Sequence, residues 1–126
     1  MSIERGSREE KSAILAEVKF FSGRRLEGRR RLLRITQEQF ASQVGIGVRW
    51  IREIEAGNPN ARIDDHIRCA EELGLPTTYL FMLMLALENR GIGIPLHSYD
   101  HMVDLERICL QAVADYIKNS NLRRGD

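Results

Sequence analysis

The chain has few of the residues from which metal sites and disulfides are built. It contains only two cysteines in 126 residues, and neither Cys69 nor Cys109 has a second ligand at the spacing of a zinc finger. A disulfide is not expected in a reducing compartment, and a buried thiol is the simpler interpretation of Cys69. His97 and His101 stand four residues apart, but no third strong ligand accompanies them. We therefore expect no metal and no other cofactor.

Long apolar runs are also missing. The longest extends from Tyr79 to Leu87 and is too short to span a bilayer, which needs roughly 20 residues. Charged residues interrupt the first eleven positions, so we expect no signal region there. No Ser/His/Asp or Cys/His arrangement can be assembled, and neither Gly45-Ile46-Gly47 nor Gly91-Ile92-Gly93 has the full pattern of a phosphate loop. These absences predict a cytoplasmic protein that is not an enzyme and makes no membrane contact.

What the sequence does contain is helical periodicity along most of its length. Apolar residues that recur every three or four positions predict an all-α protein. We expect Ser22-Gly23 to end the first helix, and Leu26 and Leu33 to point inward from the second. The expected helices cover residues 8–21, 24–34, 36–44, 47–56, 64–73, 76–89 and 99–119, with a loop at 91–95 and a frayed tail from Asn119.

The third of these helices has a well-marked beginning and end. Thr36 and Gln39 have the types and the spacing of a capping box, in which each side chain bonds the other residue's backbone N–H. Ile35 precedes the cap and is placed to pack on Phe40 as a hydrophobic staple. Gly45 stands where this helix must end and the chain must turn sharply, in a left-handed conformation that favours glycine.

A second short helix follows the turn at once. Ile46 is the apolar residue of the turn, and Gly47 is an acceptable N-cap. Ile51 and Ile54 continue an apolar stripe that can pack on the preceding helix, and Gly57 ends the second helix. Two short helices joined in this way form a helix-turn-helix, whose second helix can enter the major groove of DNA.

The stretch from about Leu26 to Leu75 resembles the DNA-binding domain of the phage lambda repressor and Cro type, the XRE family. The resemblance implies a lambda-repressor-like bundle of five helices, and regulators of transcription that usually act as dimers. The matching residues are Arg29-Arg30, Thr36-Gln37-Glu38, Ala41, Gly45, Ile51, Ile54-Glu55, Gly57, Ala70 and Leu73-Gly74-Leu75.

The resemblance implies base contacts from the start of the second helix. Gly47, Val48, Arg49 and Glu53 match the positions that face base edges. Arginine can pair with guanine, glutamate can accept from cytosine, and valine can touch a thymine methyl group. The sequence departs from the family where Gly47 replaces a serine or threonine and where Trp50 replaces a small polar residue. Trp50 therefore flanks the DNA face or belongs to the core, and both interpretations stay open.

The resemblance also implies contacts with the DNA backbone. Gln37 matches the family position that clamps a phosphate, and Arg52 flanks the base-contacting face. Asn58, Asn60 and Arg62 fall in the loop that usually touches phosphate. Double-stranded DNA is thus the expected partner.

Charge is segregated along the chain although the total is only +1. Residues 24–62 carry nine arginines and four glutamates, a net charge of +5. Residues 63–119 carry four basic and nine acidic residues, a net charge of −5. A basic lobe that contains the second helix of the motif suits phosphate binding, and an acidic lobe is expected to face away from DNA.

The C-terminal half has more apolar surface than one small domain can cover. The helix expected at 76–89 is apolar nearly all round, which predicts burial on every side. The helix expected at 99–119 has a packing seam with alternating spacings of three and four. Its residues are Met102, Leu105, Cys109, Ala112 and Tyr116. These helices predict a homodimer, or a protein partner bound through the C-terminal helix.

The predicted organisation is therefore an N-terminal helical extension at 1–23, a helix-turn-helix domain at 24–90, and a C-terminal helix at 91–126 for dimerisation or partner binding. The predicted function is that of a sequence-specific, dimeric, DNA-binding transcriptional regulator, a repressor. The alternatives are the antitoxin of a toxin–antitoxin pair and a protein-interaction module that has lost DNA binding.

Overall fold

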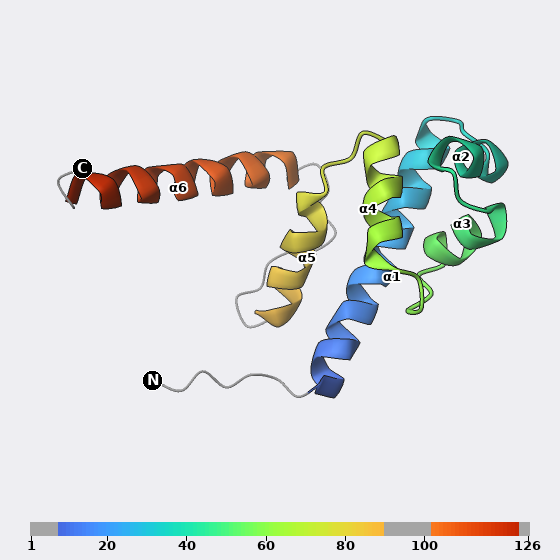
Figure 1. Cartoon of the computed structure of the whole chain (residues 1–126), viewed down its shortest axis with the longest axis horizontal. Coiled ribbons are helices and arrows are strands. Elements are labelled where there is room, and N and C mark those ends of the chain that lie inside the picture. Colours follow the sequence, from blue (N-terminus) through green and yellow to red (C-terminus); the bar gives the residue numbers. More distant parts are fainter. Residues whose placement is uncertain (1–7, 90–101, 124–126) are drawn as a thin grey trace. The chain divides into compact units, whose positions relative to one another are not determined.

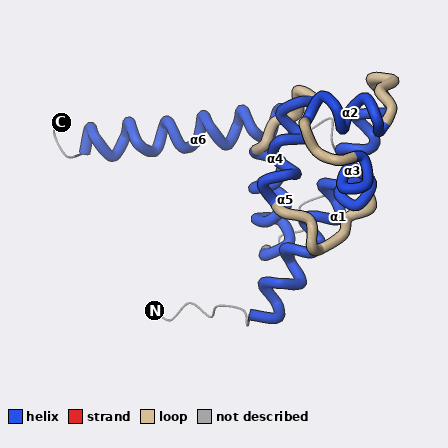
Figure 2. Tube along the Cα trace, turned by 45° about the vertical axis from the view of Figure 1, so that its right-hand side comes forward, coloured by secondary structure: helices blue, strands red, loops and turns tan. Residues whose placement is uncertain are grey.

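The computed structural model describes residues 8–89 and 102–123, and these residues form helices and loops without any strand (Figures 1 and 2). The chain divides into two compact units, Met1–Gly93 and Ile94–Asp126. The helices are α1 (Arg8–Leu32), α2 (Gln37–Val44), α3 (Val48–Glu55), α4 (Ile63–Glu72), α5 (Thr78–Glu88) and α6 (Met102–Arg123). The prediction of an all-α protein is confirmed. The loop expected at 91–95 and the pair His97 and His101 lie outside the described residues.

The first unit is built on one long helix, because the predicted break at Ser22-Gly23 does not occur. The expected N-terminal helix is present, but it is continuous with the first helix of the domain in α1. Both residues are buried against other helices. Ser22 Oγ lies 2.7 Å from His66 Nδ1 of α4, and a Cβ atom on Gly23 would lie 2.3 Å from the carbonyl oxygen of Ile54. This glycine therefore lets α3 approach α1 closely instead of ending the helix.

The core lies where α1, α2, α3 and α4 meet. Its largest side chains, among them Leu26, Phe40, Ile51 and Ile54, are at most 2% exposed. Burying side chains of this kind stabilises a fold by about 1.5–3 kcal/mol each. Leu33 was predicted to point inward, and this is wrong. It follows the end of α1 and is 43% exposed.

Helix α5 buries only one face. Leu80, Leu83 and Leu87 are almost fully buried, and α5 packs against α1. The Arg25 guanidinium of α1 lies over the Tyr79 ring, 3.8 Å from the ring centroid. On the other side, Phe81 remains 65% exposed. The first unit therefore covers one face of α5, and the predicted burial of its other face by the C-terminal segment or a second subunit stays a prediction.

Helix α6 is the described part of the second unit. It continues to Arg123, so the frayed tail predicted from Asn119 begins too early. The predicted start at 99 lies outside the described residues. Four residues of α6 form a polar strip with contacts inside the helix. Arg107 pairs with Asp104, and the Gln111 side chain donates a hydrogen bond to Asp115. Within the described ranges, no helix combines the length and the apolar character that crossing a membrane requires.

Two titratable groups are buried where α4 packs. Cys69 is fully buried, as predicted, and burial raises the pKa of its thiol to about 12. His66 is also fully buried, and burial lowers the pKa of its imidazole to about 4, with Lys19 adding to the effect and Asp65 opposing it. Ile67, the next residue on α4, is only half-buried. The buried imidazole makes stability depend on pH.

We expect the free energy of unfolding to fall as the pH drops from 7 to 5. The unfolded chain binds a proton at His66 with an ordinary pKa near 6.5, whereas the folded chain resists it until about pH 4. The neutral imidazole therefore contributes its full stabilisation of the fold only above the unfolded pKa of His66. Below that pKa the free energy of unfolding falls, by about 2 kcal/mol at pH 5. Urea unfolding at the two pH values measures this loss. His66→Gln should reduce the difference, and an unchanged difference in that variant would contradict the assignment.

Candidate nucleic-acid interface

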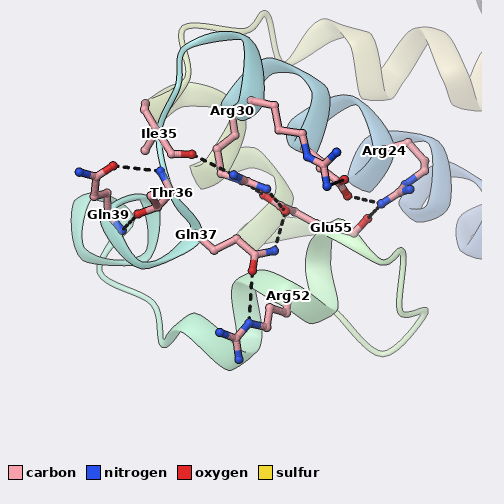
Figure 3. A network of polar contacts seen from close by, with 10 residues as sticks. Arg24, Arg30, Ile35, Thr36, Gln37, Gln39, Arg52 and Glu55 are labelled. Carbon is pink, nitrogen blue, oxygen red and sulfur yellow. Dashed lines mark hydrogen bonds and ion pairs between the residues drawn. The ribbon is translucent and has the colours of Figure 1, made fainter.

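Helix α2 begins with the predicted capping box. The backbone N–H of Gln39 donates to Thr36 Oγ1 at 3.0 Å, and the backbone N–H of Thr36 donates to Gln39 Oε1 at 2.9 Å (Figure 3). Ile35, just before the cap, packs against the core that contains Phe40. These local contacts fix where α2 begins.

The turn after α2 has the predicted glycine geometry. Gly45 has a φ of 81°, in the left-handed region, and its N–H donates to the carbonyl oxygen of Ala41 at 2.9 Å. The N–H of Ile46 donates to the same oxygen at 3.1 Å, and its side chain packs against the core. Helix α3 then starts after Gly47, which has no side chain with which to cap it. The turn therefore brings α3 into contact with α2.

Helix α3 has one buried face and one exposed face. Ile51, Ile54 and Glu55 are buried, whereas Arg49 and Arg52 are exposed. Among the described residues, the Arg49 guanidinium has no hydrogen bond or ion pair. Arg49 is therefore available to a ligand outside the protein.

Two of the proposed DNA-facing residues lie partly against the core instead. Val48 and Trp50 both pack on the core cluster. The indole N–H of Trp50 donates to Asp65 Oδ2 of α4 at 2.8 Å, and the Arg68 guanidinium near Asp65 donates to the carbonyl oxygen of Val44 at 2.9 Å. Trp50 therefore links α3 to α4.

A buried ion pair anchors the end of α3 to α1. Arg30 Nε donates to Glu55 Oε2 at 2.6 Å, and Arg30 Nη2 donates to Glu55 Oε1 at 3.0 Å (Figure 3). The hydrogen bond to Glu55 raises the pKa of the Arg30 guanidinium despite burial. A third N–H of Arg30 donates to the carbonyl oxygen of Ile35 at 2.8 Å. This pair was not predicted from the sequence, although both residues belong to the set that resembles the family.

The ion pair is connected to the surface through Gln37. The Gln37 side chain lies between Glu55 and Arg52 (Figure 3), donating to Glu55 Oε1 at 2.9 Å and accepting from Arg52 Nε at 3.2 Å. Arg52 also pairs with Glu38 at 3.3 Å. Gln37 and Arg52 thus come together, as a phosphate-contacting pair would require.

Polar side chains in the loop after α3 bind groups close to them in the sequence. Asn58 Nδ2 donates to Glu53 Oε2 at 2.8 Å, and Asn58 Oδ1 accepts from the backbone N–H of Asn60 at 2.8 Å. Arg62 pairs with Asp64 at 3.2 Å, and both side chains are largely exposed. The Glu53 carboxylate thus already has a partner, whereas Arg62 lies in a weak surface pair.

Most arginines of the predicted basic lobe already have contacts within the protein. Their guanidinium groups are therefore partly engaged, although the net charge of +5 is unchanged. Ion pairs involve Arg24, Arg30, Arg31, Arg52 and Arg62, while Arg29 donates to the carbonyl oxygen of Leu73 and Arg25 lies over Tyr79. The guanidinium groups of Arg34 and Arg49 have no such contact among the described residues.

Comparison with known proteins identifies the motif. Residues 26–80 match a family model described as helix-turn-helix. The matched range contains all of α2, α3 and α4 together with the end of α1 and the start of α5. Neither the curated proteins nor the solved structures yielded a match to the chain.

Proposed function

We propose that the chain is a DNA-binding transcriptional regulator of the XRE type, a sequence-specific repressor that acts as a dimer. The match of residues 26–80 to a helix-turn-helix family model supports this proposal. The observation that carries the proposal is the exposed face of α3, where Arg49 has no hydrogen bond or ion pair with any described residue and the core holds the helix in place. An arginine at the start of such a helix can donate two hydrogen bonds to guanine in the major groove.

The proposal gives each candidate residue a part in DNA binding. Arg49 contacts a base, and Gly47 allows the backbone to come close to the DNA. Gln37, Arg52 and the loop residues Asn58, Asn60 and Arg62 contact phosphates. Val48, Trp50 and Glu53 contribute less, because the first two pack on the core and the third binds Asn58.

We expect Arg49→Ala to relax the preference at one base pair. Losing a bidentate contact with guanine should reduce discrimination at that position by about 1–3 kcal/mol. The measurement is selection of binding sites from a random DNA pool with the wild-type chain, followed by affinity measurements on single-base variants of the selected site. Arg62→Ala is the control, because loss of a phosphate contact should weaken binding equally on every sequence. Equal weakening by Arg49→Ala would show that Arg49 contacts phosphate alone.

The dimer is proposed from the apolar surface of α6. A helix with so many large apolar side chains on its surface gains stability from a partner that covers them. Among the described side chains of α6, the large apolar ones that are more than half exposed are Ile108, Leu110, Val113, Tyr116 and Ile117. DNA sites with two-fold symmetry also favour proteins with two-fold symmetry, since two half-sites bound together raise the affinity.

We expect the wild-type chain to sediment as a dimer at tens of micromolar in analytical ultracentrifugation. Ile117→Glu should shift it towards monomer, because the charge would be buried in the apolar contact. Gln111→Glu is the matched control, since Gln111 lies on the polar strip and hydrogen-bonds Asp115. A monomeric wild-type chain, or equal effects of the two substitutions, would contradict dimerisation through α6.

A second candidate is a protein-interaction module that has lost DNA binding. Most arginines in residues 24–62 have contacts within the protein, and this favours the second candidate. These contacts occupy guanidinium groups that would otherwise bind phosphates. Selection from the random DNA pool separates the two: enrichment of one sequence supports the regulator, and failure to enrich any sequence supports the module.

A further inference from the structure

The burial of side chains decreases along a row of contacts that leads from the core to the surface. Arg30 and Glu55 have side chains that are 9% and 2% exposed, and Glu55 binds Gln37. Gln37 in turn binds Arg52, whose side chain is 56% exposed. Figure 3 shows these four side chains as one connected row from α1 to the outer side of α3. A group at the surface is thus tied to one that cannot move without disturbing the core.

The chemistry of its neighbours fixes the orientation of the Gln37 amide. The Glu55 carboxylate only accepts hydrogen bonds, and the Arg52 guanidinium only donates them. The NH₂ group of Gln37 must therefore face Glu55, and its oxygen must face Arg52. A flipped amide would place two acceptors together on one side and two donors together on the other. The NH₂ group keeps a second N–H, for which the described residues provide no acceptor.

The same arrangement restricts Arg52. An arginine side chain is long and loses much conformational freedom when it is held in one place. Here Nε is bound by Gln37, and one terminal nitrogen pairs with Glu38 at 3.3 Å. The remaining N–H groups of the guanidinium have no partner among the described residues and can donate to a phosphate. An arginine already held in position gives up less entropy when it binds DNA.

We propose that Gln37 is a positioning residue for Arg52, and that buried Glu55 sets the orientation of Gln37. The inference rests on the proposed DNA binding and adds to it that a neutral glutamine controls an ionic contact. In this arrangement Arg52 donates to a DNA phosphate, while Gln37 holds the guanidinium at the required place and donates its second N–H to the same backbone.

The salt dependence of DNA binding tests this, because it counts ionic contacts. The slope of log K against log salt changes by about 0.9 for each phosphate contact with double-stranded DNA. We expect Arg52→Met to reduce the magnitude of the slope by about that amount on the selected duplex. Gln37→Met removes no charge, yet it should reduce the slope by the same amount because Arg52 is released. The double variant should show no further reduction.

Gln43→Met is the matched control, since Gln43 is another neutral glutamine on α2 and is exposed. Its slope should equal that of the wild-type chain. Gln37→Ala, as a second variant without a long apolar side chain, should behave as Gln37→Met does. If both Gln37 variants keep the wild-type slope while Arg52→Met lowers it, Gln37 does not position Arg52 and the inference fails. A wild-type chain that enriches no DNA sequence would instead refute the proposed function.

Discussion

Replacing Glu55 with alanine is expected to lower the free energy of unfolding by about 3–5 kcal/mol. The substitution leaves the Arg30 guanidinium buried without its carboxylate partner, and removing one member of a buried ion pair has effects of this size. It also takes away the acceptor that Gln37 uses. Equilibrium urea unfolding, followed by circular dichroism, measures the change.

A control and a double substitution separate the ion pair from general effects. Glu71→Ala should change stability by no more than about 0.5 kcal/mol, because Glu71 lies exposed on α4. Replacing both Arg30 and Glu55 with leucine should lower the free energy of unfolding less than Glu55→Ala does, since no unpaired charge is then buried. A loss below about 1 kcal/mol for Glu55→Ala would mean that the pair does not anchor α3 to α1.

The substitution Gly23→Ala is expected to destabilise the fold by about 3 kcal/mol or more. The added methyl group would lie 2.3 Å from the carbonyl oxygen of Ile54 and 3.0 Å from that of Glu55. Both obstacles are backbone atoms, so α1 and α3 would have to move apart, and strain of this kind typically exceeds the gain from the extra carbon.

Gly28 provides a matched comparison within the same helix. A Cβ atom there would meet nothing within 4 Å apart from its chain neighbours and the backbone of its own helix. Gly28→Ala should therefore raise stability by about 0.5–1 kcal/mol, the usual gain when alanine replaces glycine inside a helix. Thermal unfolding measures both changes in stability. A loss for Gly23→Ala together with a gain for Gly28→Ala supports close packing at Gly23. Equal and small effects would show that α1 and α3 are not in tight contact there.

The helix-turn-helix could be predicted because its determinants are close in sequence. The capping box joins Thr36 to Gln39, three residues on, and Gly45 ends the same helix with a backbone conformation that its own type favours. Each of these features depends on a few neighbouring residues. The beginning and end of α2 therefore followed from residue types alone.

Contacts between residues distant in sequence could not be predicted in this way. Ser22-Gly23 has the composition of a helix end, but its packing against α3 and α4 makes it the middle of one. The bond from Trp50 to Asp65 decides how the indole lies, and no local pattern indicates it. In both cases, the tertiary neighbour and not the residue type determines the outcome.

Which of the arginines are available to DNA could not be predicted, for a related reason. A count of arginines and glutamates treats every charge as exposed, whereas Arg30 is buried against Glu55. The residues that remain as candidates for DNA contact are those whose polar groups still face outward, chiefly Arg49 and the Gln37–Arg52 pair. This shorter set is what the structure adds to the family resemblance.

The most direct test of DNA binding by the exposed face of α3 is a fluorescence anisotropy titration of the selected duplex with the wild-type chain and with Arg49→Ala. A second duplex has the same base composition in scrambled order. The wild-type chain should bind the selected duplex more tightly, with an affinity that falls as salt rises, and Arg49→Ala should lose part of that preference. Equal affinity of the wild-type chain for both duplexes at every salt concentration would contradict sequence-specific DNA binding by α3.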